Sequence, residues 1–104
     1  MRAVEVQITF PSEDLAEATG AALVDIRLAA CGQVTPITSV YRWKGTIEKG
    51  TEWLLTLKTV EDCVHGIETH VRDSHPYDVP QITALPVIGG SKDYIDWIVE
   101  SVEA

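Results

Sequence analysis

A histidine, a tyrosine and an aspartate lie between prolines in the segment His75-Pro76-Tyr77-Asp78-Val79-Pro80. An imidazole, a phenol and a carboxylate on a rigid segment suit two roles. In a structural role, His75 caps the last carbonyls of a preceding helix and Tyr77 fills a gap in the packing. In a functional role, the same side chains line a cleft, for example between subunits. The sequence leaves both roles open.

A second group of reactive side chains is the stretch Tyr41-Arg42-Trp43-Lys44-Gly45. Aromatic and basic side chains interleave in this way in proteins that bind single-stranded nucleic acid. The whole chain, however, has 8 Lys and Arg against 16 Asp and Glu, a formal net charge of -8. Phosphate contacts need basic side chains, so neither nucleic acid nor an anionic membrane surface is expected as a partner. We expect Tyr41 and Trp43 to pack in a subunit interface instead.

The other residues of chemical interest form no catalytic set, so no enzyme activity is predicted. His65, His70 and His75 follow one another at five-residue spacing, which places them about 140° apart around a helix and excludes a metal-binding pair on one face. We expect His65 and His70 at the surface. Cys31 and Cys63 stand alone, as reduced packing thiols of an intracellular protein do.

The length of the chain limits the number of domains, and its first residues indicate whether it carries a signal peptide. The 104 residues leave room for one domain, spanning 1–104. The first ten residues alternate between apolar and polar side chains, which predicts a strand and not a signal peptide or a membrane span. The cytoplasm is therefore the expected compartment.

The apolar pattern predicts strands and helices in the order βαββαβα. In sequence order we expect a strand over 4–10, a helix over 13–30 closed by Cys31 and Gly32, a strand over 33–43, a turn over 44–50, a strand over 51–59, a helix from about 60 that His75-Pro76 ends, an edge strand over 79–87 and a C-terminal helix. The apolar stripe expected on the first helix is Leu15, Ala18, Ala22, Ile26 and Ala29.

Two βαβ halves with right-handed crossovers give an α+β, ferredoxin-like fold: an antiparallel sheet with two helices on one face and a long central hairpin. Along the strand over 51–59, Trp53, Leu55 and Leu57 face one way, whereas Glu52, Leu54, Thr56 and Lys58 face the other. The second face of the sheet needs a cover, because a monomer would leave its apolar residues in water. An obligate homo-oligomer is therefore expected.

Short motifs along nearly the whole chain resemble those of the CutA divalent-ion tolerance proteins, in family order and with family spacing. The matching residues are Thr9-Phe10-Pro11, Leu28-Ala29-Ala30-Cys31, Tyr41-Arg42-Trp43-Lys44-Gly45, Leu57-Lys58-Thr59, His75-Pro76-Tyr77-Asp78-Val79-Pro80, Leu85-Pro86-Val87 and Tyr94-Ile95-Asp96-Trp97. The resemblance implies a cytoplasmic homotrimer in which long hairpins pair across subunits. Its fold is similar to that of the PII-type signalling trimers, which suggests ligand clefts between subunits.

The resemblance also implies a link to tolerance of divalent metals, copper especially. Where the family has a copper site, its pattern is a cysteine on the first strand and two adjacent histidines before the Pro-Tyr. Here Ile8 and Ser74 occupy two of those three positions, and only His75 matches. A lone imidazole cannot form a tight closed site for such an ion, so we expect His75 to bind metal only with help from Asp78, other carboxylates or symmetry-related copies.

Three hypotheses for function follow. The leading one is a trimeric, non-enzymatic protein of metal homeostasis or signalling, with an inter-subunit cleft formed by Tyr41, Trp43, Lys58, His75 and Tyr77. It needs no cofactor, and a divalent cation such as copper is its candidate ligand. The second is a PII-like sensor of a small anionic metabolite, held by Lys58 or Arg42. The third is a trimeric scaffold for protein partners.

Overall fold

Four antiparallel strands, three α-helices and one short 3-10 helix form the part of the chain that the structure describes. The computed structural model describes residues 2–103. Its elements are β1 (Ala3–Phe10), α1 (Glu13–Asp25), β2 (Cys31–Trp43), β3 (Thr46–Val60), the 3-10 helix η1 (Glu61–Cys63), α2 (Val64–Arg72), β4 (Ile82–Pro86) and α3 (Lys92–Ser101). The strands lie in the order β2-β3-β1-β4. The predicted order and the ferredoxin-like α+β fold are thereby confirmed.

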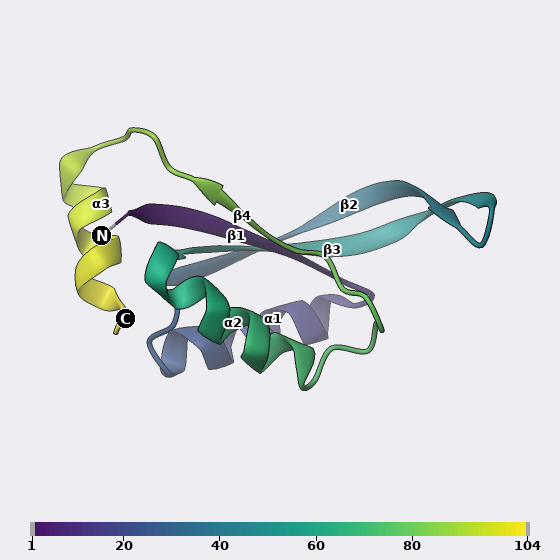
Figure 1. The fold of residues 1–104 in the computed structure, drawn as a ribbon, viewed down its shortest axis with the longest axis horizontal. Coiled ribbons are helices and arrows are strands. Elements are labelled where there is room, and N and C mark those ends of the chain that lie inside the picture. Colours follow the sequence, from purple (N-terminus) through teal and green to yellow (C-terminus); the bar gives the residue numbers. More distant parts are fainter. Residues whose placement is uncertain (1, 104) are drawn as a thin grey trace.

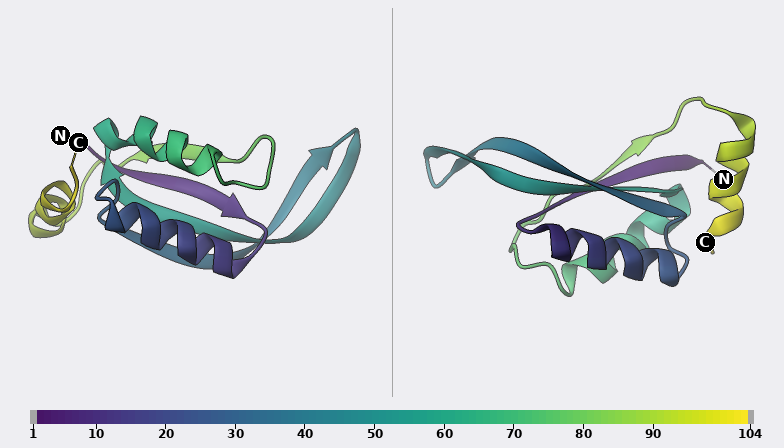
Figure 2. Two further views of the ribbon diagram at one scale, coloured as in Figure 1. Left: turned by 90° about the horizontal axis from the view of Figure 1, so that it is seen from below. Right: turned by 180° about the vertical axis from the view of Figure 1, so that it is seen from behind.

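The core lies between one face of the sheet and the helices α1 and α2, which both cover that face (Figures 1 and 2). Alternation along β1 and β3 directs the apolar side chains there, and the register pairs Ile8 with Leu55 and Val6 with Leu57. All four side chains are fully buried. The opposite face has neither α1 nor α2 on it, and α3 lies at the end of the sheet away from the hairpin tip (Figure 1).

Helix α1 is shorter than predicted, because it ends at Asp25 and not at residue 30. The chain reverses at Arg27, whose φ of 62° is left-handed, and the N–H groups of Leu28 and Ala29 both donate to the carbonyl of Leu23, at 3.0 and 3.3 Å. Such bonds satisfy the last carbonyls of a helix and close it. Cys31 therefore begins β2 and does not close the helix.

The buried face of α1 also differs from the predicted stripe. It consists of Ala16, Thr19, Gly20 and Leu23. Gly20 lets the helix lie close on the sheet, since a methyl group at this position would be 3.1 Å from Leu55 Cδ1. The predicted stripe already contained three alanines, and the observed face lies one residue further along the helix, because small residues occur around most of α1 and their spacing does not select one face.

The hairpin turn is tighter than the predicted turn over 44–50. Only Lys44 and Gly45 lie outside the strands, with φ values of 49° and 81°. Two consecutive left-handed residues form a type I′ turn, whose twist suits a hairpin. β3 therefore begins at Thr46, five residues earlier than expected. β1 pairs with β3 only as far as Trp53, so residues 37–52 project beyond β1 (Figure 1), and we call them the hairpin arm.

The second half of the fold needs two smaller corrections. Val60 still belongs to β3, and η1 precedes α2, which ends at Arg72. β4 covers only Ile82–Pro86 and pairs with β1 alone, so its edge position is confirmed, but not the predicted range 79–87. Within residues 2–103, no helix combines the length and the apolar character that crossing a membrane would need.

Candidate functional site

His75 connects the end of α2 to the end of β1. The N–H of Tyr77 donates to His75 Nδ1 at 3.1 Å, and His75 Nε2 lies 2.8 Å from the Thr9 carbonyl oxygen. Since Nδ1 accepts a hydrogen bond from Tyr77, the geometry fits the tautomer in which Nε2–H donates to the Thr9 carbonyl. The ring also stacks on Phe10 at a centroid distance of 4.7 Å. Both ring nitrogens are thus engaged within the chain, and the side chain does not cap α2.

Tyr77 connects the same segment to the hairpin arm. Its hydroxyl donates to Glu52 Oε2 at 2.8 Å, and its ring centroid is 4.8 Å from that of His75. Burial raises the pKa of Tyr77 to about 12, and the hydrogen bond to Glu52 and the negative charge of that residue contribute to the increase. Tyr77 is therefore a neutral donor at physiological pH, and it fixes the Glu52 carboxylate.

These contacts border a cleft of about 700 Å³ between the hairpin arm and the segment 76–81, which we call the arm cleft. Its lining residues are Thr9, Ser39, Val40, Tyr41, Trp43, Glu52, Pro76, Tyr77, Asp78, Val79 and Gln81. Three of the five predicted site residues, Tyr41, Trp43 and Tyr77, are therefore brought together from two distant segments. His75 does not line the cleft but contacts Tyr77, which does.

The arm cleft has a distinctive chemical character. Its walls include three aromatic rings, and its charged lining residues are the carboxylates Glu52 and Asp78. No lysine, arginine or histidine is among the lining residues. Tyr41 and Trp43 remain 48% and 57% exposed, so this chain alone does not cover their rings. The cleft can therefore offer aromatic surface and negative charge, but no basic group for an anion.

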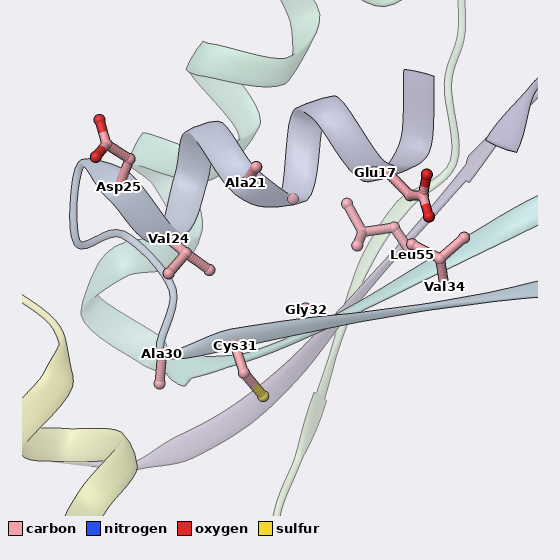
Figure 3. Close-up of a pocket in the computed structure, with 10 residues that line it drawn as sticks. Glu17, Ala21, Val24, Asp25, Ala30, Cys31, Gly32, Val34 and Leu55 are labelled. Atoms are coloured by element: carbon pink, nitrogen blue, oxygen red, sulfur yellow. The ribbon is translucent and has the colours of Figure 1, made fainter. Parts of the chain in front are cut away.

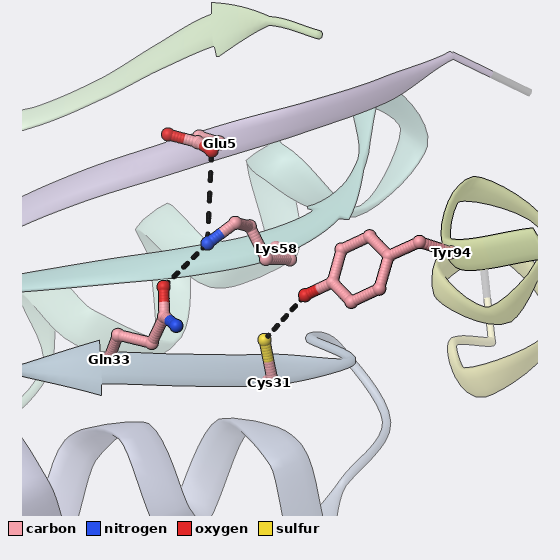
Figure 4. A network of polar contacts seen from close by, with 5 residues as sticks. All are labelled: Glu5, Cys31, Gln33, Lys58 and Tyr94. Carbon is pink, nitrogen blue, oxygen red and sulfur yellow. Dashed lines mark hydrogen bonds and ion pairs between the residues drawn. The ribbon is translucent and has the colours of Figure 1, made fainter. Parts of the chain in front are cut away.

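Lys58, the fourth predicted site residue, lies outside the cleft. It is six residues from Glu52, roughly 20 Å along a strand. Its ammonium group donates to Gln33 Oε1 at 2.6 Å and is 3.8 Å from Glu5 Oε2 on the face of the sheet opposite α1 and α2 (Figure 4). Strand alternation also separates Arg42 from its aromatic neighbours, and its guanidinium donates to the Gly45 carbonyl at 3.3 Å.

The structure brings together few of the groups that could hold a metal. Among residues 2–103, no group of three or more His, Cys, Asp and Glu side chains is arranged to bind an ion. Ile8 is buried in the core and Ser74 is exposed. His65 is at the surface as predicted, whereas His70 is half-buried and its Nδ1 is enclosed without a hydrogen-bond partner.

The cysteines are free, as expected from their isolation in the sequence. Cys63 is buried, and Cys31 is half-buried on β2, where its sulfur lies 3.6 Å from the Tyr94 hydroxyl (Figure 4). The hydrogen bond to Cys31 and burial both raise the pKa of Tyr94. This contact links α3 to β2.

A second groove, of about 750 Å³, runs between α1 and the edge strand β2. Small and apolar residues such as Gly20, Ala21 and Val34 line most of it, and its carboxylates, Glu17 and Asp25, lie far apart along α1 (Figure 3). Ligand sites combine an apolar pocket with convergent polar groups. The arm cleft has that combination and is the better candidate.

Sequence reasoning missed Thr9 and Glu52 as members of this site. Glu52 was identified only as a residue of the mixed sheet face, and nothing in its neighbourhood marks it as a partner of Tyr77. The missing information is tertiary, because the segment after α2 must first fold back across the end of β1. The one feature of the sequence that could have drawn attention to Glu52 is its position, because it is an acidic residue at the point where the strand passes from the core to the exposed arm.

The chain and its fold are similar to those of known proteins. The model of the CutA1 divalent ion tolerance protein family matches residues 4–101. The divalent-cation tolerance protein CutA of Thermus thermophilus is 43% identical over 92% of this chain and 94% of its own length. A solved structure of the divalent cation tolerance protein from Thermus thermophilus superposes with a TM-score of 0.93 at 41% identity, covering 97% of this chain and 99% of that one.

A solved structure of CutA from Archaeoglobus fulgidus, described as periplasmic, is equally similar in fold. It has a TM-score of 0.93 and 37% identity and covers 97% of this chain and 99% of its own. The compartment given for that protein differs from the cytoplasm expected from the present sequence, so the cytoplasmic location stays a prediction.

Proposed function

The chain belongs to the CutA1 divalent ion tolerance protein family, and we propose that it takes part in a cytoplasmic response to divalent cations without catalysing a reaction. It acts by binding an ion or a small ligand in the arm cleft. The observation that carries the proposal is the convergence of Tyr41, Trp43 and Tyr77 on one cleft from segments more than thirty residues apart. His75 supports this geometry through its contacts with Tyr77 and Thr9.

The working form is a homotrimer, as the resemblance implies. Two features support association: the sheet face away from α1 and α2 lacks a helical cover, and the hairpin arm exposes large apolar side chains. Val40, Trp43 and Ile47 on the arm are 66%, 57% and 60% exposed. Apolar patches of this kind usually mark interfaces. In a trimer, the arm cleft lies at a subunit boundary.

For copper, we propose a weak site at His75, assisted by carboxylates such as Asp78. The support is the position of the imidazole beside Tyr77, at the edge of an acidic cleft. A metal must take the lone pair that now accepts the Tyr77 N–H, so binding costs one internal hydrogen bond. Neither Ile8 nor Ser74 can replace the missing soft ligands, which is a second reason for low affinity.

Calorimetric titration with copper(II) chloride in a non-chelating buffer tests this site. We expect a saturable heat for the wild type and for the surface control His65→Ala, and at least tenfold weaker binding for His75→Ala. His75→Gln retains a hydrogen-bond donor and acceptor and guards against an effect of misfolding. Identical titrations for all four proteins would remove His75 from the proposal, and the absence of saturable heat in the wild type would remove copper.

A sensor for an anionic metabolite would need basic side chains in its binding site, and Lys58 or Arg42 was expected to supply them. Lys58 is committed to Gln33 and Glu5, and no basic side chain lines the arm cleft. A scaffold without a small ligand is the alternative that remains. It would gain support if neither metal nor small molecules stabilise the protein against heat, since any ligand of the folded state must do so.

A further inference from the structure

We propose that the arm cleft selects a small organic cation, of the quaternary or alkylammonium class. This inference rests on the proposed function of the arm cleft as the ligand site and specifies what the ligand is. It depends on three observations: the aromatic walls, the sign of the lining charges and the lack of metal ligands.

The walls supply the contact surface. Tyr41, Trp43 and Tyr77 line the same cleft, and the faces of aromatic rings attract cations, tryptophan most strongly. Trp43 already shows this preference within the chain, because the ammonium group of Lys44 lies 5.7 Å from its ring centroid. Lys44 is not among the lining residues of the cleft.

The lining charges that this chain contributes disfavour an anion and favour a cation. Glu52 and Asp78 are the only ionisable side chains of the lining besides the tyrosines. The Tyr77 hydroxyl donates to Glu52, which keeps that carboxylate at the cleft and leaves the Tyr77 ring neutral. The net charge of -8 for the chain adds an attractive field for any positively charged ligand.

The coordination chemistry favours an organic cation over a bare metal ion in this cleft. No group of three metal-ligating side chains is present among residues 2–103, and a cleft of about 700 Å³ is far larger than an ion. It is within the usual range for small-molecule sites. An alkylated ammonium ion needs no inner-sphere ligands, because ring faces and nearby carboxylates replace its weak hydration.

A matched pair of probes tests the inference. Choline and 3,3-dimethylbutan-1-ol have the same shape, but the second has carbon in place of the charged nitrogen. Calorimetric titration should show choline binding at least about tenfold tighter than the neutral alcohol, the ratio that corresponds to roughly 1.4 kcal/mol. Equal affinity for the two probes would overturn the inference, as would the absence of choline binding.

Variants assign the binding to the cleft. Trp43→Leu keeps an apolar side chain but removes the ring, and should weaken choline binding at least fivefold, whereas Trp43→Phe should retain most of it. Trp97→Leu, which alters an exposed ring on α3 outside the cleft, should leave binding unchanged. Light scattering must show the wild-type mass for each variant. Equal choline affinity in the wild type and Trp43→Leu would contradict the assignment.

The two proposals fail in different ways. If copper(II) binds in a His75-dependent manner but choline does not bind, the organic-cation inference fails and the proposed function stands. If neither probe binds, the organic-cation inference fails, copper is removed from the proposed function, and the scaffold alternative gains support.

Discussion

His75 illustrates how one side chain can be more constrained than its sequence context suggests. Its ring donates to Thr9, accepts from Tyr77 and stacks on Phe10. Its contacts thereby connect three parts of the chain: the end of β1, the end of α2 and the segment that borders the arm cleft. The histidine therefore supports the cleft structurally whether or not it binds metal.

Replacing His75 with alanine should lower the free energy of unfolding by about 2–3 kcal/mol, since two hydrogen bonds and one aromatic contact are lost. The buried carbonyl of Thr9 is left without its partner. Denaturant unfolding at equal protein concentrations measures the change, and His65→Ala, at the surface of α2, should differ from the wild type by less than about 0.5 kcal/mol. An equal loss of unfolding free energy in the two variants would show that the contacts of His75 do not stabilise the fold.

Tyr77 should titrate as an unusually weak acid. Its pKa of about 12, against an ordinary 10.0, follows mainly from burial and next from Glu52. Ultraviolet absorbance of tyrosinate should show one residue ionising near pH 12 in the wild type and none there in Tyr77→Phe. In Glu52→Gln the pKa should fall, but not to 10, because burial remains.

The same shift has a consequence for stability. The folded-state pKa of Tyr77 is raised, so its contribution is fully present below pH 10 and is lost as the pH rises through 12. Tyr77→Phe should therefore flatten the alkaline decline in unfolding free energy. A decline of the same steepness in both proteins would show that Tyr77 is not coupled to folding.

At the scale of elements, the type I′ turn determines where the hairpin arm ends. Gly45 has a φ of 81° with nothing near it, so alanine there would be strained by the backbone and not by crowding. Gly45→Ala should lower the free energy of unfolding by about 1 kcal/mol. Gly50→Ala is the matched control: its surroundings are equally open but it lies in a strand, where alanine should raise that energy by about 0.5 kcal/mol. Both values come from denaturant unfolding, and a similar loss for both glycines would contradict the turn assignment.

Much of the fold follows from the sequence because alternation and helical spacing are local. β1 and the order of elements are examples, and so is the start of α1, where Ser12 accepts a hydrogen bond from the N–H of Leu15 at 3.3 Å. The end of α1 did not follow, since Ile26 and Ala29 continue the helical spacing although the chain reverses between them at Arg27. Spacing cannot reveal a reversal that tertiary packing favours.

The site was predictable only in part, for the same reason. Tyr77 was identified in a rigid segment between prolines, and Tyr41 and Trp43 in a stretch where aromatic and basic side chains interleave, which are local properties. The exclusion of Lys58 depends on strand register, because β3 pairs it with Cys31 and Glu5 at the end of the strand away from the cleft. Local patterns can thus identify the residues of a site, whereas register decides which of them meet.

For the whole molecule, the long axis of 44 Å, against 27 and 21 Å for the others, reflects the hairpin arm. An isolated two-stranded arm is marginally stable in water, yet this one carries Val40, Trp43 and Ile47 in exposed positions. A second chain that covers the arm would bury these side chains and complete the arm cleft. Stability and ligand binding should therefore both depend on assembly.

Light scattering should give a mass of about 34 kDa, that of three chains of 11.4 kDa.

Leu54 is half-buried on the face away from α1 and α2, between Thr9 and Thr35 in the register. Leu54→Glu should lower the mass toward that of one chain, because a buried carboxylate without a partner is costly. Ala18→Glu, at an exposed position of α1, should leave the mass unchanged, and circular dichroism should confirm folding in each case. A wild-type mass near 11 or 23 kDa would exclude the trimer. Unchanged assembly in Leu54→Glu would instead indicate that the subunits meet through the hairpin arms and not through this face of the sheet.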